Sequence, residues 1–412
     1  MKVKKPNRFI YFTAYGMVYP LLKILFRLEV NRKFFDLPKG PFILLANHST
    51  MLDFLFTMLP LFPKRRVNAV TAQKFFLHKP LHKALPAMGC IPKKMFDPDV
   101  RSIVGIKNVL KRGGCVLLFP EGRITNSMAY AGMHKSTGKL LKKLGVPVVS
   151  CFIEGGDVCI PHWRRGFRLG KIRVTYRNLF SADDLSSLSV SEINAAVDAR
   201  LSGAQGGVPA RKPYKTLRAK KLAEGLSRIL YYCPRCECEF TLETKGNTIT
   251  CKSCGYSASM DRQGLLTPVD GSGDGEHVSV WFAKQTRFEM RSLDEDKLPI
   301  IDKVTVRTPS SKPGDGTIVS GAGIMTIDRS GWQFDGELHG EKTTLFFPVE
   351  SVPALSYSHH DSYQIYFGGD YYTFAPDDPK KCIKYVVLAE CLHRKFANDP
   401  LMTAGVNSGF VE

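Results

Sequence analysis

The 412-residue sequence lacks several features that would define a class of protein at once. Charged residues make up only 23% of it and hydrophobic residues 44%, a composition that excludes a disordered tail and a collagen-like fibre. It contains no G-x-S-x-G nucleophile elbow and no H-E-x-x-H metal motif, so neither a serine hydrolase of the elbow type nor a zincin has support. The apolar N-terminal stretch leads into Lys23 and Arg27 without the small-residue cleavage site of a signal peptide, so we do not expect secretion.

The N-terminal apolar stretch is also short of the length that a membrane span needs. Residues 9–22 carry no charge, but these 14 residues fall short of the roughly 20 that cross a bilayer perpendicularly. Their aromatic side chains, followed by Lys23 and Arg27, favour an element that lies among lipid headgroups with its basic residues facing phosphates. The alternative is a core helix of a soluble domain. We therefore expect residues 1–30 to form an interfacial, membrane-associated helical segment on an anionic membrane surface.

Acidic residues are scarce in the first half of the chain. Residues 1–232 hold 40 Lys and Arg against 13 Asp and Glu, a net charge of +27, whereas residues 233–412 hold 18 against 25, a net charge of −7. The formal +20 therefore belongs to one half, and the charge break near residue 232 marks a candidate domain boundary. A basic half points to polyanionic partners, which include nucleic acid, an anionic membrane surface and phosphorylated substrates.

The eleven cysteines do not form the pattern of a disulfide framework, so we expect a reducing, intracellular compartment. Two C-x2-C pairs, Cys233 with Cys236 and Cys251 with Cys254, flank a predicted hairpin. This spacing matches a four-thiolate zinc ribbon over residues 233–260. Four thiolates leave no open coordination position, so the predicted zinc is structural rather than catalytic.

Short apolar runs alternate with amphipathic segments in the first half. This alternation predicts an α/β domain over residues 31–205 with a mixed, largely parallel sheet. The predicted strands are residues 42–47, 67–72, 115–120, 148–155 and 171–177, and the predicted helices are residues 99–112 and 135–144.

The second half of the sequence predicts a different set of elements. Residues 206–232, rich in Gly, Pro, Lys and Arg, predict a basic linker. Strand-like runs then recur from residue 276, beginning with residues 278–283, and an amphipathic helix closes the series within residues 380–396. The pattern predicts a mainly β domain over residues 276–400 with a C-terminal helix, and it is somewhat similar to a pleckstrin-homology-type domain.

Two polar side chains fall off the apolar stripe of that C-terminal helix. Glu390 and Arg394 are four residues apart and outside the stripe formed by Tyr385, Leu388 and Leu392. We expect both to face water.

A first polar motif follows the strand at residues 42–47, where the functional loops of a parallel sheet lie. His48 and Asp53 are five residues apart and would not meet on an uninterrupted helix, but they can meet if Thr50 caps the helix and His48 sits in the incoming turn. Such a pair suits a His general base that a carboxylate holds in the correct tautomer. Alternatively, Thr50-x-x-Asp53 is a capping-box-like signature in which Asp53 serves only the helix start.

A second polar motif follows the strand at residues 115–120. Gly122 would let the backbone approach a ligand, Arg123 would grip a phosphate with its planar fork, and Glu121 would orient substrate or neighbouring base groups. In isolation the tripeptide also reads as an ordinary glycine-containing turn.

The two motifs together are more specific than either alone. The pattern N-H-x4-D at residues 47–53, followed by F-P-E-G-R-I-T at residues 119–125, resembles the glycerolipid acyltransferase family of 1-acylglycerol-3-phosphate acyltransferases. The resemblance covers roughly residues 1–205, with further similar blocks at residues 89–92 and 146–148. It implies transfer of an acyl group from acyl-CoA or acyl carrier protein to the free hydroxyl of a lysophospholipid, first of all 1-acyl-glycerol-3-phosphate, without a covalent acyl-enzyme.

The resemblance also implies roles for single residues. His48 would remove the proton from the acceptor hydroxyl, and Asp53 would stabilise the imidazolium that forms. The residues implied to bind the acceptor are Glu121, Gly122, Arg123 and Thr125.

One departure from the family pattern concerns the acceptor phosphate. After the block at residues 89–92 the family often carries an Arg, whereas this chain has Lys93 and Lys94. Either lysine would offer a point charge without the bidentate fork, which leaves the identity of the acceptor open. The alternative is that both are solvated surface lysines.

These features predict a peripheral or monotopic enzyme at the cytoplasmic face of the cell membrane, with a lysophospholipid and an acyl carrier as partners. Nucleic acid is not expected, because the sequence around residues 233–243 is acidic and the N-terminal segment is apolar. The alternatives are an acyltransferase for glycerol 3-phosphate or another lysolipid, a non-catalytic lipid-binding protein, and a nucleic-acid-binding zinc-ribbon protein.

Overall fold

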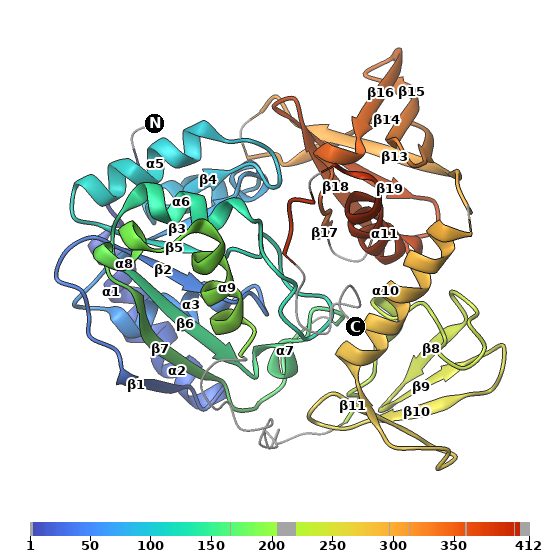
Figure 1. Ribbon diagram of the computed structural model, residues 1–412, viewed down its shortest axis with the longest axis horizontal. Coiled ribbons are helices and arrows are strands. Elements are labelled where there is room, and N and C mark those ends of the chain that lie inside the picture. The colour runs from blue at the N-terminus through green and yellow to red at the C-terminus, as the bar shows by residue number, and fades with distance from the viewer. Residues whose placement is uncertain are drawn as a thin grey trace.

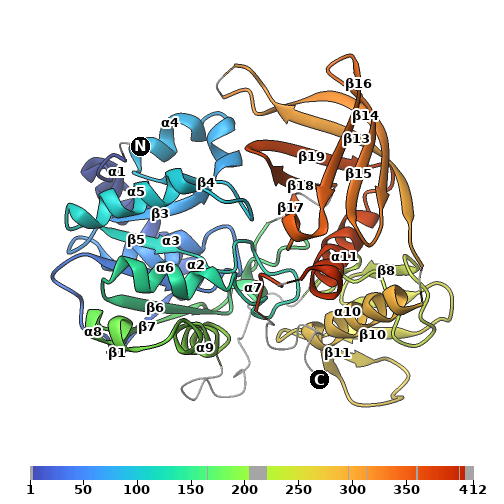
Figure 2. The same ribbon diagram turned by 45° about the horizontal axis from the view of Figure 1, so that its top comes forward.

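Three sheets organise the part of the chain that the computed structural model describes. Figures 1 and 2 show the first half, from blue to green, beside the second half, from yellow to red. The described residues are 3–164, 166–203, 220–295, 297–312, 314–358, 361–398 and 400–403.

The first half is built on a seven-stranded sheet in the order β1-β7-β6-β2-β5-β3-β4. Neighbouring strands are parallel except for β6 and β7, so the predicted mixed, largely parallel sheet is confirmed. The central strands β2 and β5 are wholly buried and apolar, as parallel strands covered on both faces are. The strands are β1 (Glu29–Phe34), β2 (Phe42–Ala46), β3 (Val67–Ala72), β4 (Ile91–Lys93), β5 (Cys115–Leu118), β6 (Val148–Glu154) and β7 (Arg173–Phe180).

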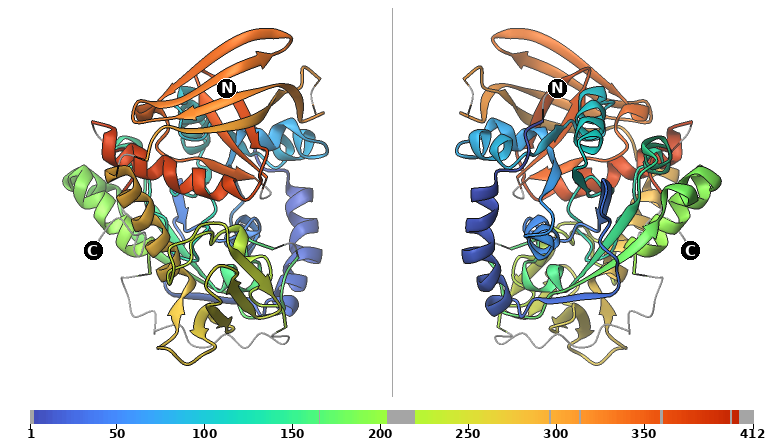
Figure 3. Two further views of the ribbon diagram at one scale, coloured as in Figure 1. Left: turned by 90° about the vertical axis from the view of Figure 1, so that its right-hand side faces the viewer. Right: turned by 90° about the vertical axis from the view of Figure 1, so that its left-hand side faces the viewer.

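Helices cover both faces of this sheet. Because successive side chains of a strand point to opposite faces, Ile43 and Leu45 of β2 join the core beneath one set of helices, while Phe42 and Leu44 join the core beneath the other. The first set is α5 (Val100–Lys111), α6 (Ser136–Leu144), α8 (Ala182–Ser187) and α9 (Val190–Leu201). The second set is α1 (Arg8–Thr13), the π-helical turn η1 (Ala14–Val18), α2 (Tyr19–Leu25) and α3 (Asp53–Met58), and Figure 3 shows α1 and α2 on the opposite side of the sheet from α9.

Short helical segments complete the first half. They are the 3-10 turns η2 (Leu59–Leu61) and η3 (Gln73–Leu77) and the helices α4 (Leu81–Ala87) and α7 (Gly156–Cys159). None of the described helices is both long enough and apolar enough to cross a bilayer.

The second half begins earlier than its composition indicated. Residues 206–219 of the expected linker lie outside the described residues, but residues 220–232 are packed rather than extended. They contain the turn η4 (Leu226–Arg228), and Leu226, Ile229 and Leu230 are fully buried. The positive charges in this stretch concealed an apolar pattern that belongs to the core of the second half.

The cysteine-rich region forms a five-stranded antiparallel sheet in the order β12-β11-β10-β9-β8. Its core is continuous with that of the following elements, so the ribbon and the β domain are packed together. The strands are β8 (Leu242–Lys245), β9 (Thr248–Cys251), β10 (Ser257–Met260), β11 (Leu265–Pro268) and β12 (Glu276–His277).

One predicted strand is wrong. Residues 278–283 begin the helix α10 (Val278–Asp294), whose start is capped by the His277 side chain accepting from Ser279 N–H. The aromatic and β-branched residues indicated a strand, but Val278, Trp281 and Gln285 recur at helical spacing and are all buried. Tertiary packing of that face decides against the local β-propensity.

The remaining elements confirm a mainly β domain closed by a C-terminal helix, α11 (Lys381–Phe396). All seven strands are antiparallel to their neighbours, in the order β16-β15-β14-β13-β19-β18-β17, and the turn η5 (Val349–Ser351) follows β16. The strands are β13 (Ile300–Pro309), β14 (Thr317–Ile327), β15 (Gly331–Leu338), β16 (Glu341–Pro348), β17 (Ser356–Ser358), β18 (Ser362–Phe367) and β19 (Asp370–Pro376).

Candidate active site

The two polar motifs meet because β2 and β5 are adjacent parallel strands, so their carboxyl ends lie at one edge of the sheet. The His48 backbone N–H donates to Glu121 Oε1 at 2.6 Å, and Thr125 N–H donates to the His48 carbonyl at 2.9 Å. Asn47 holds the first loop from the other side, since its side-chain amide exchanges hydrogen bonds with the backbone of Ile153 on β6. The loop that carries His48 is therefore fixed by both neighbouring strands.

His48 and Asp53 form the predicted pair. His48 Nδ1 lies 2.9 Å from Asp53 Oδ2, and the His48 ring stacks on Phe119 with centroids 4.1 Å apart. The Asp53 side chain is completely buried, whereas the His48 side chain keeps 21% exposure. With Nδ1 donating to the carboxylate, Nε2 is the nitrogen that can accept a proton.

Asp53 also anchors the turn before its helix. Oδ2 accepts from Ser49 N–H at 2.6 Å and from Thr50 N–H at 2.8 Å, and Thr50 Oγ1 donates to Oδ1 at 2.8 Å. Helix α3 begins at Asp53 with Leu52 in the capping position, so the prediction that Thr50 is the N-cap is wrong. The carboxylate orients His48 and organises the incoming turn at the same time.

Glu121 holds loops rather than facing outward. It is 1% exposed, and its second oxygen accepts from Ala131 N–H at 3.0 Å, so both oxygens are bound to backbone N–H groups. Burial raises the pKa of Glu121 to about 8, against the lowering effect of these two N–H groups and of Arg123.

Gly122 and Thr125 shape the same loop. Gly122 has a φ of +69°, and a Cβ there would lie 3.2 Å from the Met95 side chain and 3.3 Å from the Phe96 ring. The Thr125 hydroxyl donates to the carbonyl of Ala129 within its own loop. Both residues support the loop that presents Arg123.

Arg123 is where the structure departs most from expectation. Its Nη2 forms an ion pair with Glu390 Oε1 of α11 at 2.5 Å, and the two side chains are only 9% and 11% exposed. The expectation that Glu390 faces water is therefore wrong. Arg394 on the same helix is also largely enclosed, since burial lowers its pKa and its Nη2 donates to the carbonyl of Thr403 at 2.7 Å.

Lys93 and Lys94, where this chain departs from the family pattern, are not freely solvated. Lys94 Nζ donates to the Gly369 carbonyl, in the turn between β18 and β19, at 2.7 Å. Burial lowers the pKa of Lys93, while the carboxylates of Asp99 and Asp97 act in the opposite direction. Both lysines are partly buried, and Lys94 is held by the second half.

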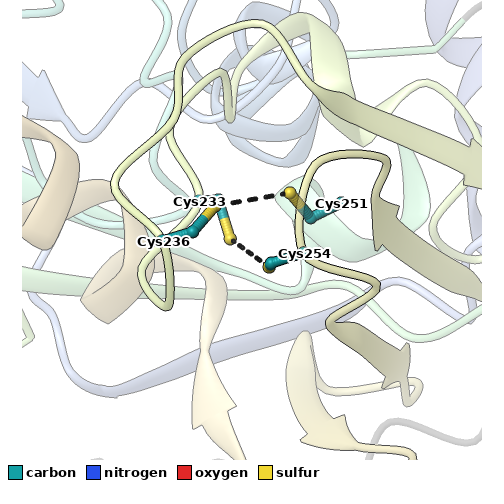
Figure 4. A group of neighbouring side chains, drawn as sticks. All are labelled: Cys233, Cys236, Cys251 and Cys254. Carbon is teal, nitrogen blue, oxygen red and sulfur yellow. Dashed lines mark hydrogen bonds between the residues drawn. The ribbon is translucent and has the colours of Figure 1, made fainter.

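The four cysteines of the predicted ribbon converge, as Figure 4 shows. All four sulfur atoms lie within 4.8 Å of one another, with 3.8 Å between Cys233 and Cys254 and 3.7 Å between Cys236 and Cys251. Zn–S bonds of about 2.3 Å in a tetrahedron place the sulfur atoms about 3.8 Å apart, so the donor set fits zinc.

Sequence reasoning missed Glu390 as part of the site. Glu390 lies on α11, and the ribbon and the strands of the β domain lie between it and Arg123 in the sequence. The pattern of residues around Glu390 indicates only a polar position outside an apolar stripe. No motif marks such a residue, because the contact exists only once the two halves are packed together.

Comparison with known proteins agrees with this geometry. Residues 27–154 match the family model described as Acyltransferase. A chloroplast 1-acyl-sn-glycerol-3-phosphate acyltransferase of Brassica napus is 28% identical over 137 residues, which cover 32% of this chain and 39% of that protein. Its Arabidopsis thaliana counterpart is 26% identical over 187 residues, 44% of this chain and 51% of that protein. The chain thus spans about half or less of the length of these curated relatives.

A solved structure, the 1-acyl-sn-glycerophosphate acyltransferase of Thermotoga maritima, matches 50% of this chain and 82% of its own at 17% identity, with a TM-score of 0.42. The family match identifies residues 27–154 as an acyltransferase segment. The same segment is similar to the two plant 1-acyl-sn-glycerol-3-phosphate acyltransferases, in agreement with the resemblance that its motifs carry.

Proposed function

We propose that this protein transfers a fatty acyl group from acyl-CoA or acyl carrier protein to the free hydroxyl of a lysophospholipid, with 1-acyl-glycerol-3-phosphate as acceptor and phosphatidic acid as product. The observation that carries the proposal is the pair of His48 and Asp53, 2.9 Å apart on a loop that the second family motif holds in place. The two plant relatives, named for this acceptor, support the choice of substrate.

In the proposed reaction, His48 Nε2 takes the proton of the acceptor hydroxyl while the hydroxyl oxygen attacks the thioester carbonyl. Asp53, which accepts from Nδ1, fixes the tautomer whose Nε2 carries no proton and stabilises the imidazolium that forms afterwards. Collapse of the tetrahedral intermediate breaks the C–S bond, and the imidazolium returns the proton to the departing thiolate. The acyl group therefore passes directly from donor to acceptor.

Arg123 is the proposed ligand of the acceptor phosphate, because its planar fork matches two phosphate oxygens. Lys93 and Lys94 are the proposed substitutes for the arginine that the family often carries after the block at residues 89–92. Glu121, Gly122 and Thr125 act by holding the two loops that carry Arg123 and His48. A different acceptor, glycerol 3-phosphate or another lysolipid, remains the second candidate because lysine at residues 93 and 94 lacks the fork of arginine.

Attachment to the cytoplasmic face of a membrane is proposed to run through α1, η1 and α2. Their outward side carries large apolar side chains at 53–77% exposure, and Lys23 and Arg27 lie at its C-terminal end. A stripe of this kind buries its apolar groups at the headgroup boundary while basic residues contact lipid phosphates. The exposed apolar residues are Phe9, Phe12, Met17, Leu21 and Ile24.

The C-terminal half is proposed to carry a structural zinc and a pleckstrin-homology-like domain. Zinc bound by Cys233, Cys236, Cys251 and Cys254 would have no open coordination position, so it would stabilise the ribbon and take no part in acyl transfer. Two antiparallel meanders, β13 to β16 and β17 to β19, are joined where β13 pairs with β19, and this sheet followed by α11 supports the comparison of the β domain.

The test of the proposed function is acyl transfer by the purified full chain in vesicles. Wild-type protein, His48→Ala and the control His339→Asn are incubated with acyl-CoA or acyl carrier protein and a panel of acceptors. We expect His48→Ala to lower turnover by about 100-fold or more, as loss of a general base does, and His339→Asn, on the distant hairpin between β15 and β16, to leave it unchanged. Equal product from His48→Ala and wild type would contradict the mechanism.

A further inference from the structure

The proposed phosphate ligand is already occupied by a carboxylate of the same chain. Glu390 forms a single ion pair to Arg123 through Nη2, and the second terminal nitrogen, Nη1, is buried without a hydrogen-bond partner among the described residues. A carboxylate and a phosphate oxygen are the same kind of acceptor for a guanidinium. Glu390 therefore takes one arm of the fork and leaves the other unsatisfied.

The space beside this ion pair is too small for an acceptor. A cavity of about 30 Å³ lies between Arg123 and Tyr130 of the first half and Phe282, Thr286 and Glu390 of the second. That volume holds about two water molecules. A phosphorylated glycerol headgroup is several times larger, so it can reach Arg123 only if α11 moves away.

Other contacts of the second half lie on the same side. Lys94 is held by the carbonyl of Gly369, and Lys74 Nζ donates to Gln364 Oε1 at 2.8 Å. Burial without a nearby carboxylate lowers the pKa of Lys74 to about 8. The β domain thus covers three cationic side chains of the acyltransferase segment.

The C-terminal tail, residues 400–403, holds the second half against the acyltransferase segment. Met402 pairs with His134 in an antiparallel bridge, and Thr403 Oγ1 accepts from Met133 N–H at 2.8 Å and donates to Asp198 Oδ1 at 3.0 Å. Arg394 of α11 donates to the Thr403 carbonyl, which links this tail to the helix that carries Glu390.

We propose that Glu390 is an autoinhibitory residue, which occupies Arg123 in the resting chain and must leave it before a phosphorylated acceptor binds. The inference rests on the proposed function, in which Arg123 binds the acceptor phosphate. A phosphate can displace the carboxylate because it satisfies both arms of the fork and carries more charge. While Glu390 occupies Arg123, the acceptor binds only those molecules in which α11 has moved away. The apparent affinity for the acceptor is therefore reduced in proportion to the population of that open state.

The first test compares Glu390→Gln with Glu337→Gln, the same change at an exposed position of β15. Binding of inorganic phosphate and of glycerol 3-phosphate to the full chain is measured by calorimetry. We expect Glu390→Gln to lower both dissociation constants by about tenfold, a typical coupling between two competing contacts, and Glu337→Gln to match wild type. A Glu390→Gln protein that binds no more tightly than wild type overturns the proposal.

A second test keeps Glu390 in place, in case its replacement disturbs folding. The bridge between His134 and Met402 is flanked by bonds from Lys135 N–H to the Leu401 carbonyl and from Thr403 N–H to the Met133 carbonyl, so it is the narrow pair with Cα atoms about 4.5 Å apart. That separation suits a disulfide in the double variant His134→Cys/Met402→Cys, formed with oxidised glutathione. We expect the oxidised form to bind phosphate about tenfold more weakly than the reduced form, while Met402→Cys alone does not respond. Equal binding in both forms overturns the proposal.

These readouts separate the two proposals. Phosphate binding does not require acyl transfer, so tighter binding by Glu390→Gln together with no transfer in any vesicle assay contradicts the proposed function and leaves the competition between Glu390 and phosphate standing. Transfer that depends on His48 together with unchanged binding by Glu390→Gln contradicts the autoinhibition alone.

Discussion

Asp53 shows how one side chain can serve the fold and the chemistry together. Its carboxylate accepts two backbone N–H groups of the preceding turn and also the Nδ1 proton of His48. The two interpretations that the sequence left open, a helix-start residue and a catalytic partner, are therefore compatible. The carboxylate that organises the turn is therefore also the one placed to stabilise an imidazolium at His48.

Glu121 also acts as a single residue, and it predicts how the stability of the fold depends on pH. Burial raises its pKa from 4.5 to about 8, so the folded state holds this proton more tightly than the unfolded chain does. The contribution of Glu121 to stability is therefore complete below pH 4.5 and is lost as the pH rises through about 8. We expect the difference in urea midpoint between wild type and Glu121→Gln to fall from pH 5.5 to pH 8.5.

Comparing the two proteins at each pH removes the contributions of other groups. The charged neighbours that act on Glu121 are Arg123 and Asp53, and both are present in wild type and variant. A midpoint difference that stays constant over this range would show that Glu121 does not titrate there.

At the scale of elements, the π-helical turn η1 explains why the N-terminal helix presents one apolar stripe. The exposed residues Phe9 and Phe12 are three apart, and Met17, Leu21 and Ile24 follow at steps of five, four and three. The step of five ends within Ala14–Val18, where the wider turn takes up one extra residue. Without that residue, the second part of the stripe would rotate away from the first.

This stripe predicts a specific loss of membrane binding. We expect Met17→Asp to lower partitioning onto anionic phospholipid vesicles by about tenfold. The variant loses the burial of one large apolar side chain, and its new negative charge is repelled by the anionic lipids. Val100→Asp is the matched control, since Val100 is 73% exposed against 71% for Met17 but lies on α5. Sedimentation with vesicles measures both, and undiminished binding of Met17→Asp would contradict this attachment.

The ribbon gives a prediction about metal. We expect the wild-type protein to contain about one zinc per chain and Cys254→Ser to lose it, because three thiolates no longer close the tetrahedron. Cys238→Ser is the matched control, since Cys238 is a neighbouring thiol outside the group of four. Metal analysis by mass spectrometry decides the matter, and full zinc content in Cys254→Ser would argue against a four-cysteine site.

At the scale of the whole molecule, the two halves meet through complementary charge. Arg123 pairs with Glu390 in a nearly dry contact, and Lys79 pairs with Asp315 at the surface. The surface pair contributes little in water, whereas the buried pair is costly to break because each charge would be left unsatisfied. The position of the second half thus depends on enclosed polar contacts together with apolar packing, since Met128, Val158 and Trp163 of the first half share a buried cluster with the core of the second half.

A substitution at Thr403 weakens the contact between the two halves without changing a residue of the candidate active site. Thr403→Val removes one hydrogen bond with Met133 and one with Asp198, a loss of about 1–3 kcal/mol. We expect amide hydrogen exchange in α11 to become about tenfold faster, because local opening becomes easier. Thr317→Val, the same change at the start of β14, is the control and should leave exchange in α11 unchanged. Unaltered exchange in Thr403→Val would show that the tail does not fasten the helix.

Much of the local structure was predictable because it depends on patterns within short segments. Alternating apolar runs indicated the strands β2 and β5, and residues just after those strands proved to be the ones that meet. The start of α10 and residues 220–232 were assigned incorrectly for one reason. Their local composition favours a strand or a linker, and only contacts with distant elements make them a helix and a buried segment.

The sequence by itself determined the acyltransferase segment, the charge difference between the halves and the spacing of the four cysteines, because each of these is a property of residue types at fixed separations. Only the tertiary structure decided what the excess positive charge faces. Arg123 and Lys94 look like open phosphate ligands along the chain, yet Glu390 and Gly369 lie against them. Contacts between residues so far apart depend on how whole elements pack, and no periodicity or motif records that.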